Sequence, residues 1–232
     1  MKGKRVLLTG GTGGLGLGVT PAVLERGAST ITIPFHSEKG LERLKSKLSA
    51  LDFERIRFVK ADLNQESVVE QLVNDLGRVD VLIHLVGGFS MGATDQFSFA
   101  DWQKSLDLNL NTTFLVCKHC LRLMRKHEYG RIVTVGSRGA VQPSAKGAAY
   151  CAAKAGVVAL TQAIAQETKD LDITANTILP SVIDTPDNRE AMGDQQADRW
   201  VKPESIAQVI CWLASESAKD IRGAAIPIYG AI

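Results

Sequence analysis

Three side chains near the middle of the sequence have the types and spacing needed for proton transfer. Ser137 opens the segment SRGAVQPSAKGAAYCAAK, and Tyr150 and Lys154 lie four positions apart at its end. On a helix, residues i and i+4 project from the same face, so the ammonium would lie beside the phenol. A nearby positive charge favours phenolate, which makes the phenol a better acid–base group near neutral pH. A Tyr-x-x-x-Lys pair also occurs in helices that have no chemical role, so the surrounding elements must decide between the two readings.

The sequence predicts a layered α/β fold around these residues. Short β-branched runs alternate with longer segments of helical periodicity, and strands that are apolar throughout are typical of a parallel sheet covered on both faces. We therefore expect one domain over 1–232, a doubly wound Rossmann-type fold with about seven parallel strands and helices on both faces. The expected strands are 5–9, 29–35, 55–61, 79–86, 130–136, 172–179 and 224–228, and the expected helices are 14–26, 38–50, 65–76, 101–127, 150–169 and 204–215.

A glycine-rich segment follows the first expected strand. Residues 9–18 read TGGTGGLGLG and open the first expected helix. Glycines at this place allow a tight turn and let backbone N–H groups approach a pyrophosphate at the positive end of the helix. Asp62 follows the third expected strand, where it would cap the next helix or accept a hydrogen bond from an adenine amino group. Ser137 ends the fifth expected strand at the same edge, so the glycine turn and the proton-transfer residues would share one cleft.

Composition narrows the class of protein. The 232 residues include 27 basic and 25 acidic side chains, a balance that gives no footprint for nucleic acid or for a polybasic membrane contact. The first residues contain an apolar run too short for a signal peptide or membrane anchor. Four cysteines show no disulfide spacing, and the pair Cys117 and Cys120 lies in a helical pattern with no second pair, so we expect buried thiols, no metal site and a reducing cytoplasm.

Taken together, these motifs resemble those of the short-chain dehydrogenase/reductase family, and the resemblance covers essentially the whole chain. The resemblance is carried by TGGTGGLG, the pair Asp62-Leu63, Asn109 in LDLNLNTTF, Ser137 in RIVTVGS, the run YCAAK, ILPSVIDTP and the closing IRGAAIPIYGA. It implies an oxidoreductase that moves a hydride between a nicotinamide cofactor and a carbonyl, alcohol or imine. It also implies a catalytic tetrad of Asn109, Ser137, Tyr150 and Lys154. In the family the asparagine breaks a helix to hold a water in a proton relay, the lysine also binds the nicotinamide ribose, and a threonine matching Thr185 contacts the carboxamide.

Four departures from the family pattern affect the cofactor site. The usual Asn-Asn-Ala-Gly reads His84-Leu85-Val86-Gly87, and we expect His84 to pack or to bond to backbone rather than to do chemistry. The acid that binds ribose in NAD-preferring members falls at Pro34, a common basic handle for the 2′-phosphate falls at Gly13, and Pro-Gly reads Pro180-Ser181. With no carboxylate at 34 and with His36, Ser37 and Lys39 nearby, the sequence favours NADP(H) over NAD(H) weakly. The expected cofactor residues are Thr9, Gly10, Thr12, Gly13, Gly14, Leu15, Gly16, His36, Asp62, Leu63, Gly87, Tyr150, Lys154, Pro180, Val182, Ile183 and Thr185.

The substrate should meet loops after the fourth, fifth and sixth strands, including a substrate loop near 181–203 that lacks strong periodicity. Arg138 would face an acidic substrate or remain a solvated surface cation. The substrate is expected to be a small molecule: a ketone, an aldehyde or a 3-oxoacyl group. The runs VGG and LPSVIDTPDNREAM are similar to the dihydropteridine-reductase branch, which gives a second candidate, and a non-catalytic dinucleotide sensor or scaffold gives a third. The expected pocket residues are Phe89, Met91, Ser137, Arg138, Gln142, Ser181, Arg189 and Met192.

Self-association is also expected. The helices expected over 101–127 and 150–169 carry more apolar side chains than one sheet face needs. Members of the family usually pair these helices in a four-helix bundle. The resemblance therefore implies a homotetramer, with a homodimer as the next expectation.

Overall fold

The computed structural model describes all residues, 1–232, and contains one seven-stranded sheet with every strand pair parallel. The strand order is β3-β2-β1-β4-β5-β6-β7, so the order reverses between β1 and β4, as in a doubly wound fold. The strands are β1 (Arg5–Thr9), β2 (Thr30–Phe35), β3 (Ile56–Lys60), β4 (Val81–His84), β5 (Tyr129–Val135), β6 (Asp172–Pro180) and β7 (Ala225–Ile228). The fold class predicted from the sequence is confirmed.

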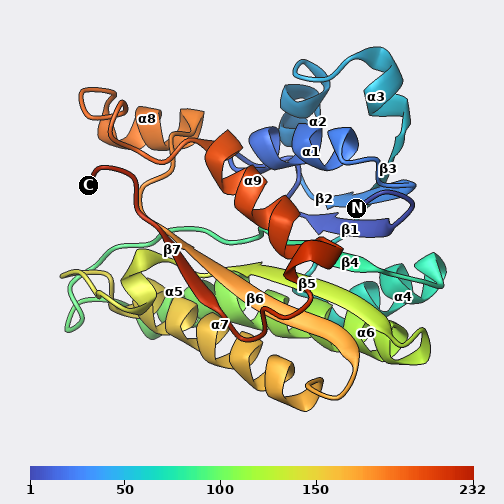
Figure 1. Cartoon of the computed structure of the whole chain (residues 1–232). Helices are drawn as coiled ribbons and strands as arrows, with labels where there is room; N and C mark the ends of the chain where they lie inside the picture. The colour runs from blue at the N-terminus through green and yellow to red at the C-terminus, as the bar shows by residue number, and fades with distance from the viewer.

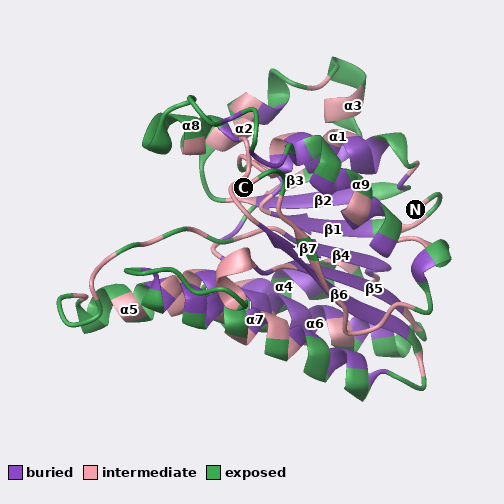
Figure 2. Cartoon of the chain, turned by 60° about the vertical axis from the view of Figure 1, so that its left-hand side comes forward, coloured by how far each residue is buried: buried purple, intermediate pink, exposed green.

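Helices cover both faces of the sheet (Figure 1). One core packs α1 (Gly16–Glu25), α2 (Glu38–Lys45) and α9 (Pro203–Leu213) on the sheet, and the other packs α4 (Glu66–Leu76), α6 (Thr112–Lys126) and α7 (Ala148–Glu167) on the opposite face. Figure 2 shows the central strands buried throughout, whereas the helices expose one side. This explains why the strands read as continuous apolar runs and the helices read as amphipathic.

One expected helix is shorter than predicted and another is divided. The helix expected over 38–50 ends at Lys45, and a separate short helix that was not predicted, α3 (Ala50–Glu54), follows it, with the N-cap Ser49 accepting a hydrogen bond from Asp52 N–H. The segment expected over 101–127 forms α5 (Phe99–Leu106), a π-helical turn (Asp107–Asn111) and α6. The periodicity predicted a continuous helix in both segments, but a local serine cap and a change of helical pitch are not visible in an apolar pattern.

The segment near 181–203 contains one element that the sequence pattern did not predict. It is α8 (Pro186–Met192), which begins where the Thr185 hydroxyl accepts a hydrogen bond from Asn188 N–H and Pro186 occupies the first turn. Figure 1 places α8 beyond the carboxyl ends of the strands, and Figure 2 shows it close to α2. Arg43 on α2 and Asp187 on α8 form an exposed ion pair at 2.9 Å, which links the two elements.

Among the helices, only α7 is long and apolar enough to cross a membrane by the measures of length and composition. A core helix of a globular protein meets the same criterion. Here α7 packs against β5 and β6.

Candidate active site

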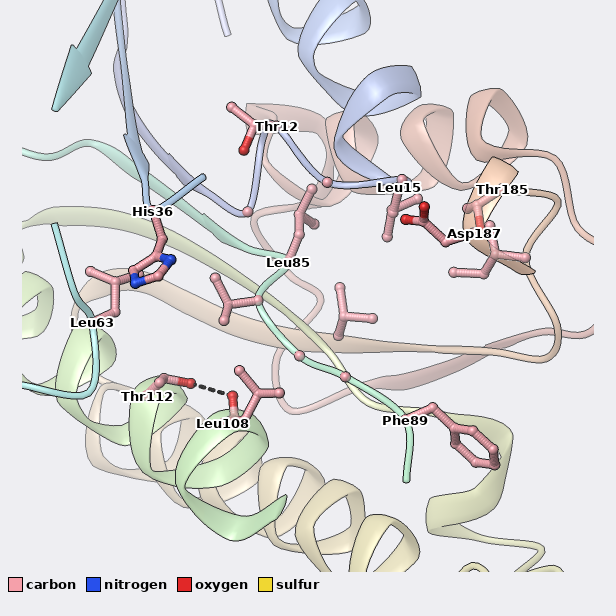
Figure 3. A pocket seen from close by; sticks show the side chains of 18 of the residues that line it. Thr12, Leu15, His36, Leu63, Leu85, Phe89, Leu108, Thr112, Thr185 and Asp187 are labelled. Atoms are coloured by element: carbon pink, nitrogen blue, oxygen red, sulfur yellow. Dashed lines mark hydrogen bonds between the residues drawn. The ribbon is translucent and has the colours of Figure 1, made fainter. Parts of the chain in front are cut away.

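A cavity of about 770 Å³ lies at the carboxyl edge of the sheet. Its walls come from the β1–α1 turn, from the segments that follow β2 to β6, and from α8 (Figure 3). Ligands bind at this edge of doubly wound sheets because the strand order reverses there and the flanking loops separate. The predicted residues that line it are Gly10, Thr12, Gly13, Gly14, Leu15, His36, Asp62, Leu63, Gly87, Phe89, Tyr150, Lys154, Pro180, Ser181, Ile183 and Thr185.

The glycine turn brings bare backbone to one wall of the cavity. Gly10 has φ 73°, and a Cβ on it would lie 2.9 Å from the backbone of Leu85, so only glycine fits there without strain. A Cβ on Gly14 would lie 2.9 Å from Thr185 at the start of α8. The first turn of α1 contains no acidic residue, so the positive end of its dipole is not neutralised. This cradle fits the pyrophosphate of a dinucleotide.

Two predicted cofactor residues, Thr9 and Gly16, are packed behind the cradle and do not line the cavity. Thr9 is fully buried and bonds to His84, and Gly16 packs so tightly that a Cβ would lie 2.4 Å from Gly11. Val182 also lies outside the lining.

Asp62 lies at the other end of the cavity. Its carboxylate accepts hydrogen bonds from the backbone and side-chain nitrogens of Asn64, both at 3.0 Å, and these bonds hold its pKa below the usual range. The helix-cap interpretation of Asp62 was wrong, because Gln65 is the N-cap of α4. Pro34, His36 and Ser37 line the cavity within and after β2, and none of the three carries a carboxylate, although the Asp62 carboxylate lies near His36.

Tyr150, Ser137 and Lys154 come together as their spacing predicted. Ser137 ends the β5 segment, accepts a hydrogen bond from Gly139 N–H at 3.1 Å, and is hydrogen-bonded to Tyr150. Lys154 is buried, and its Nζ lies 5.9 Å from the Tyr150 ring centre and donates to the Val135 carbonyl at 2.9 Å.

The electrostatic expectation for Tyr150 was wrong for this structure. Burial raises the pKa of Tyr150, and the hydrogen bond from Ser137 only partly opposes that change. Burial also lowers the pKa of Lys154 to about 8, because a desolvated ammonium is disfavoured. In this structure the lysine therefore does not lower the pKa of the phenol.

Asn109 lies in the π-helical turn, fully buried. Its side chain binds the backbone of Gly88 twice, accepting from N–H at 3.1 Å and donating to the carbonyl at 3.0 Å. The Asn109 carbonyl accepts the Thr113 hydroxyl at 2.7 Å. The helix is thus widened and not broken as the resemblance implied, and Asn109 fixes the loop after β4.

His84 is buried beside Lys154 at the end of β4. Its Nδ1 lies 2.8 Å from the Thr9 hydroxyl and its Nε2 has no partner. Of the two expectations for this histidine, its burial agrees with packing, whereas its one hydrogen bond is to a side chain and not to backbone. Burial, with a smaller contribution from the charge on Lys154, lowers the pKa of His84 to about 3. His84 is therefore neutral near pH 7.

The two arginines expected at the substrate end, Arg138 and Arg189, do not line the cavity. Arg138 donates to Gln142 and to the Ile232 carbonyl, each at 2.8 Å, and its guanidinium stacks over Tyr229. Arg189 binds Asp184 through two hydrogen bonds. No side-chain carboxylate is bonded to Arg138, and its role as a counter-ion for an acidic substrate stays a prediction. The predicted pocket residues outside the lining are Met91, Ser137, Arg138, Gln142, Arg189 and Met192.

Several lining residues were missed at the sequence level. Leu108 and Thr112 lie on either side of Asn109 in the sequence and are four positions apart, so they share one helix face. That spacing is a signal that could have identified them. Leu85, Val86 and Gly136 line the cavity because they adjoin predicted positions at strand ends. Ala61 and Asn64 are the other missed residues of the walls.

Comparison with known proteins agrees with this geometry. Residues 4–196 match the family model described as short chain dehydrogenase. The chain belongs to the short-chain dehydrogenase family. This short-chain dehydrogenase is 30% identical to a 3-oxoacyl-[acyl-carrier-protein] reductase of Haemophilus influenzae, over 100% of the chain and 99% of that protein. It is 29% identical to a D-beta-hydroxybutyrate dehydrogenase of Cupriavidus necator, over 97% of the chain and 95% of that protein.

The solved structures give the same result. Levodione reductase superposes with a TM-score of 0.89 at 27% identity, over 100% of the chain and 97% of that structure. As a member of this family, the chain is an oxidoreductase of alcohol and carbonyl groups, and the family uses nicotinamide cofactors.

Proposed function

We propose that this short-chain dehydrogenase reduces a small carbonyl compound, or oxidises the matching alcohol, with Tyr150 as the general acid and base. The observation that carries the proposal is that Tyr150 and Lys154 line the cavity that also contains the glycine cradle, while Ser137, outside that lining, is hydrogen-bonded to Tyr150. A bound nicotinamide dinucleotide would supply or accept the hydride. The cradle residues Gly13 and Gly14 would hold its pyrophosphate, and Thr185 would lie at its nicotinamide end.

The protein groups perform the proton chemistry. The Tyr150 hydroxyl gives its proton to the substrate oxygen during reduction, because the raised pKa keeps it protonated near neutral pH. Ser137 donates a hydrogen bond to the same oxygen and orients it. The hydrogen bond from Lys154 to the Val135 carbonyl holds the lysine ammonium near Tyr150. Asn109 holds the loop after β4 through its two hydrogen bonds to Gly88.

Replacement of Tyr150 by Phe tests this assignment. Tyr150→Phe should lower kcat by on the order of 10²- to 10⁴-fold, because the proton donor is lost while the ring remains. Coenzyme affinity, measured by fluorescence titration, should stay close to that of the wild type. Tyr129→Phe is the matched control, since Tyr129 bonds to Glu216 at the opposite edge of the sheet. Unchanged turnover in Tyr150→Phe would contradict the proposal, and coenzyme binding without turnover in the wild type would favour a dinucleotide sensor.

The coenzyme is proposed to be NADP(H). In support, His36 and Ser37 line the adenosine end of the cavity and Pro34 occupies the place of the ribose-binding acid. We expect a higher kcat/KM with NADPH than with NADH in steady-state kinetics, and the reverse order would contradict the choice.

We also propose a cytoplasmic homotetramer. The surface of α6 exposes Phe114, and the start of α5 exposes Phe99, which would be covered in a helix-to-helix interface. A monomer in light scattering would contradict it, and a homodimer would narrow the interface to one helix pair.

A further inference from the structure

Phe89 is an exposed aromatic side chain that the fold holds in one place. It follows β4, lines the mouth of the cavity (Figure 3), and leaves 64% of its surface exposed. Its ring meets the Tyr150 ring edge to face, with centres 5.0 Å apart and planes at 79°. A large apolar ring that stays exposed beside a catalytic hydroxyl needs an explanation, because burying it would stabilise the fold.

The loop that carries Phe89 is fixed on both sides. The Asn109 side chain binds both backbone groups of Gly88, which precedes Phe89. Farther along, Ser90 donates to the Ser105 hydroxyl at 3.2 Å and Gly92 N–H donates to the Lys146 carbonyl at 2.8 Å. The ring is thus exposed without being loosely held, and binding a ligand on it costs little ordering entropy.

The charges around this end of the cavity point to an uncharged substrate. The lining contains no arginine, and its one lysine is Lys154, whose Nζ already donates to the Val135 carbonyl. Asp187, the acid at this end, is paired with Arg43. A carboxylate or phosphate on the substrate would therefore enter without a counter-ion and would pay its desolvation cost uncompensated.

We infer that the substrate is an uncharged carbonyl compound whose C=O is conjugated to a planar ring, and that Phe89 selects it by stacking against that ring. This inference rests on the proposed function and names the substrate class of the same site. Phe89 is then a specificity-determining residue: it places the ring so that the carbonyl oxygen reaches Tyr150 and Ser137. The class differs from the carboxylate named by the hydroxybutyrate dehydrogenase relative.

Three probes separate this class from the others. They are 1-phenyl-1,2-propanedione, its cyclohexyl counterpart, which keeps the size and loses the flat ring, and acetoacetate, which carries a carboxylate. We expect the wild-type kcat/KM with NADPH to be highest for the phenyl compound. Phe89→Leu should lower that value about 3- to 10-fold through KM, which is the worth of an aromatic pair, and should change the other two less than about 2-fold.

Two control variants complete the experiment. Phe89→Tyr keeps an aromatic ring and should keep the preference. Leu51→Ala removes another exposed apolar side chain, 76% exposed and outside the cavity lining, and should leave kcat/KM for all three probes unchanged. Equal losses on all three probes in Phe89→Leu, a wild-type preference for acetoacetate, or no wild-type turnover of any probe would overturn the inference. The proposed function fails separately, when Tyr150→Phe keeps the turnover of whichever carbonyl compound the wild type reduces.

Discussion

The two edges of the same sheet treat their polar groups in opposite ways. At the amino edge, the fully buried Arg131 donates to the Gly130 and Asp172 carbonyls and to the carboxylates of Asp172 and Glu216, and only its Nε lacks a partner. Tyr129 lies against the same guanidinium and donates to Glu216 at 2.8 Å. At the carboxyl edge, Tyr150 and Lys154 line an open cavity and His84 Nε2 has no partner.

This difference separates stability from function. Charges at the amino edge are satisfied within the protein, so that edge can stabilise the fold and has little left to offer a ligand. Groups at the carboxyl edge are buried without full compensation, which shifts their pKa values and keeps hydrogen-bonding capacity for a substrate.

The largest effect on stability is expected at the amino edge. The double substitution Asp172→Ala with Glu216→Ala leaves the Arg131 charge buried without a carboxylate, which should lower the free energy of unfolding by about 3–5 kcal/mol. Urea unfolding measures it. Asp170→Ala, which removes an exposed neighbouring acid, is the control and should have little effect. The kcat of the folded double variant should equal that of the wild type, and a fall in kcat would show that the edges are coupled.

Two glycines with positive φ compare the edges directly. Gly10 and Gly77 have φ 73° and 65°, but a Cβ would meet the Leu85 backbone at 2.9 Å on Gly10 and nothing within 4 Å on Gly77. Gly10→Ala should lower the free energy of unfolding by about 2–4 kcal/mol and raise the coenzyme KM, while Gly77→Ala should cost about 1 kcal/mol from backbone strain alone. Thermal unfolding and steady-state kinetics measure the pair. If Gly10→Ala and Gly77→Ala lowered the free energy of unfolding equally, the close contact with the Leu85 backbone at Gly10 would have no energetic cost.

The smallest effect concerns His84 and pH. Its pKa of about 3 in the folded state lies below the ordinary value of 6.5, so between these values the unfolded chain binds the extra proton. The stability is therefore fully present above about pH 6.5 and is lost as the pH falls towards 3, by about 1 kcal/mol at pH 5.5. His84→Asn removes the titrating ring, so its free energy of unfolding should fall less steeply than that of the wild type over this range. Parallel pH curves would show that the ring is not held neutral.

Much of the site followed from local sequence. Tyr150 and Lys154 share a helix face because a helix repeats every 3.6 residues. The turn after β1 is glycine-rich because a Cβ on Gly10 would collide with the Leu85 backbone. Placing Ser137 beside Tyr150 needed only the rule that parallel strands end at one edge. The seven strands were predictable from local sequence too, because each is a short apolar run bounded by polar turns.

Long-range partners were not predictable in this way. Nothing in the residues around Arg138 shows that its guanidinium reaches the Ile232 carbonyl, 94 positions away, and nothing around His84 shows that it bonds to Thr9. The direction of the Tyr150 pKa was missed because burial is a property of the assembled core and not of the Tyr-x-x-x-Lys spacing. The sequence by itself determined which elements form and which groups meet at the sheet edge, because periodicity and backbone geometry act locally. Only the tertiary structure decided which charges are already paired, how strongly each group is desolvated, and that Phe89 remains exposed beside Tyr150, because those properties depend on contacts between distant parts of the chain.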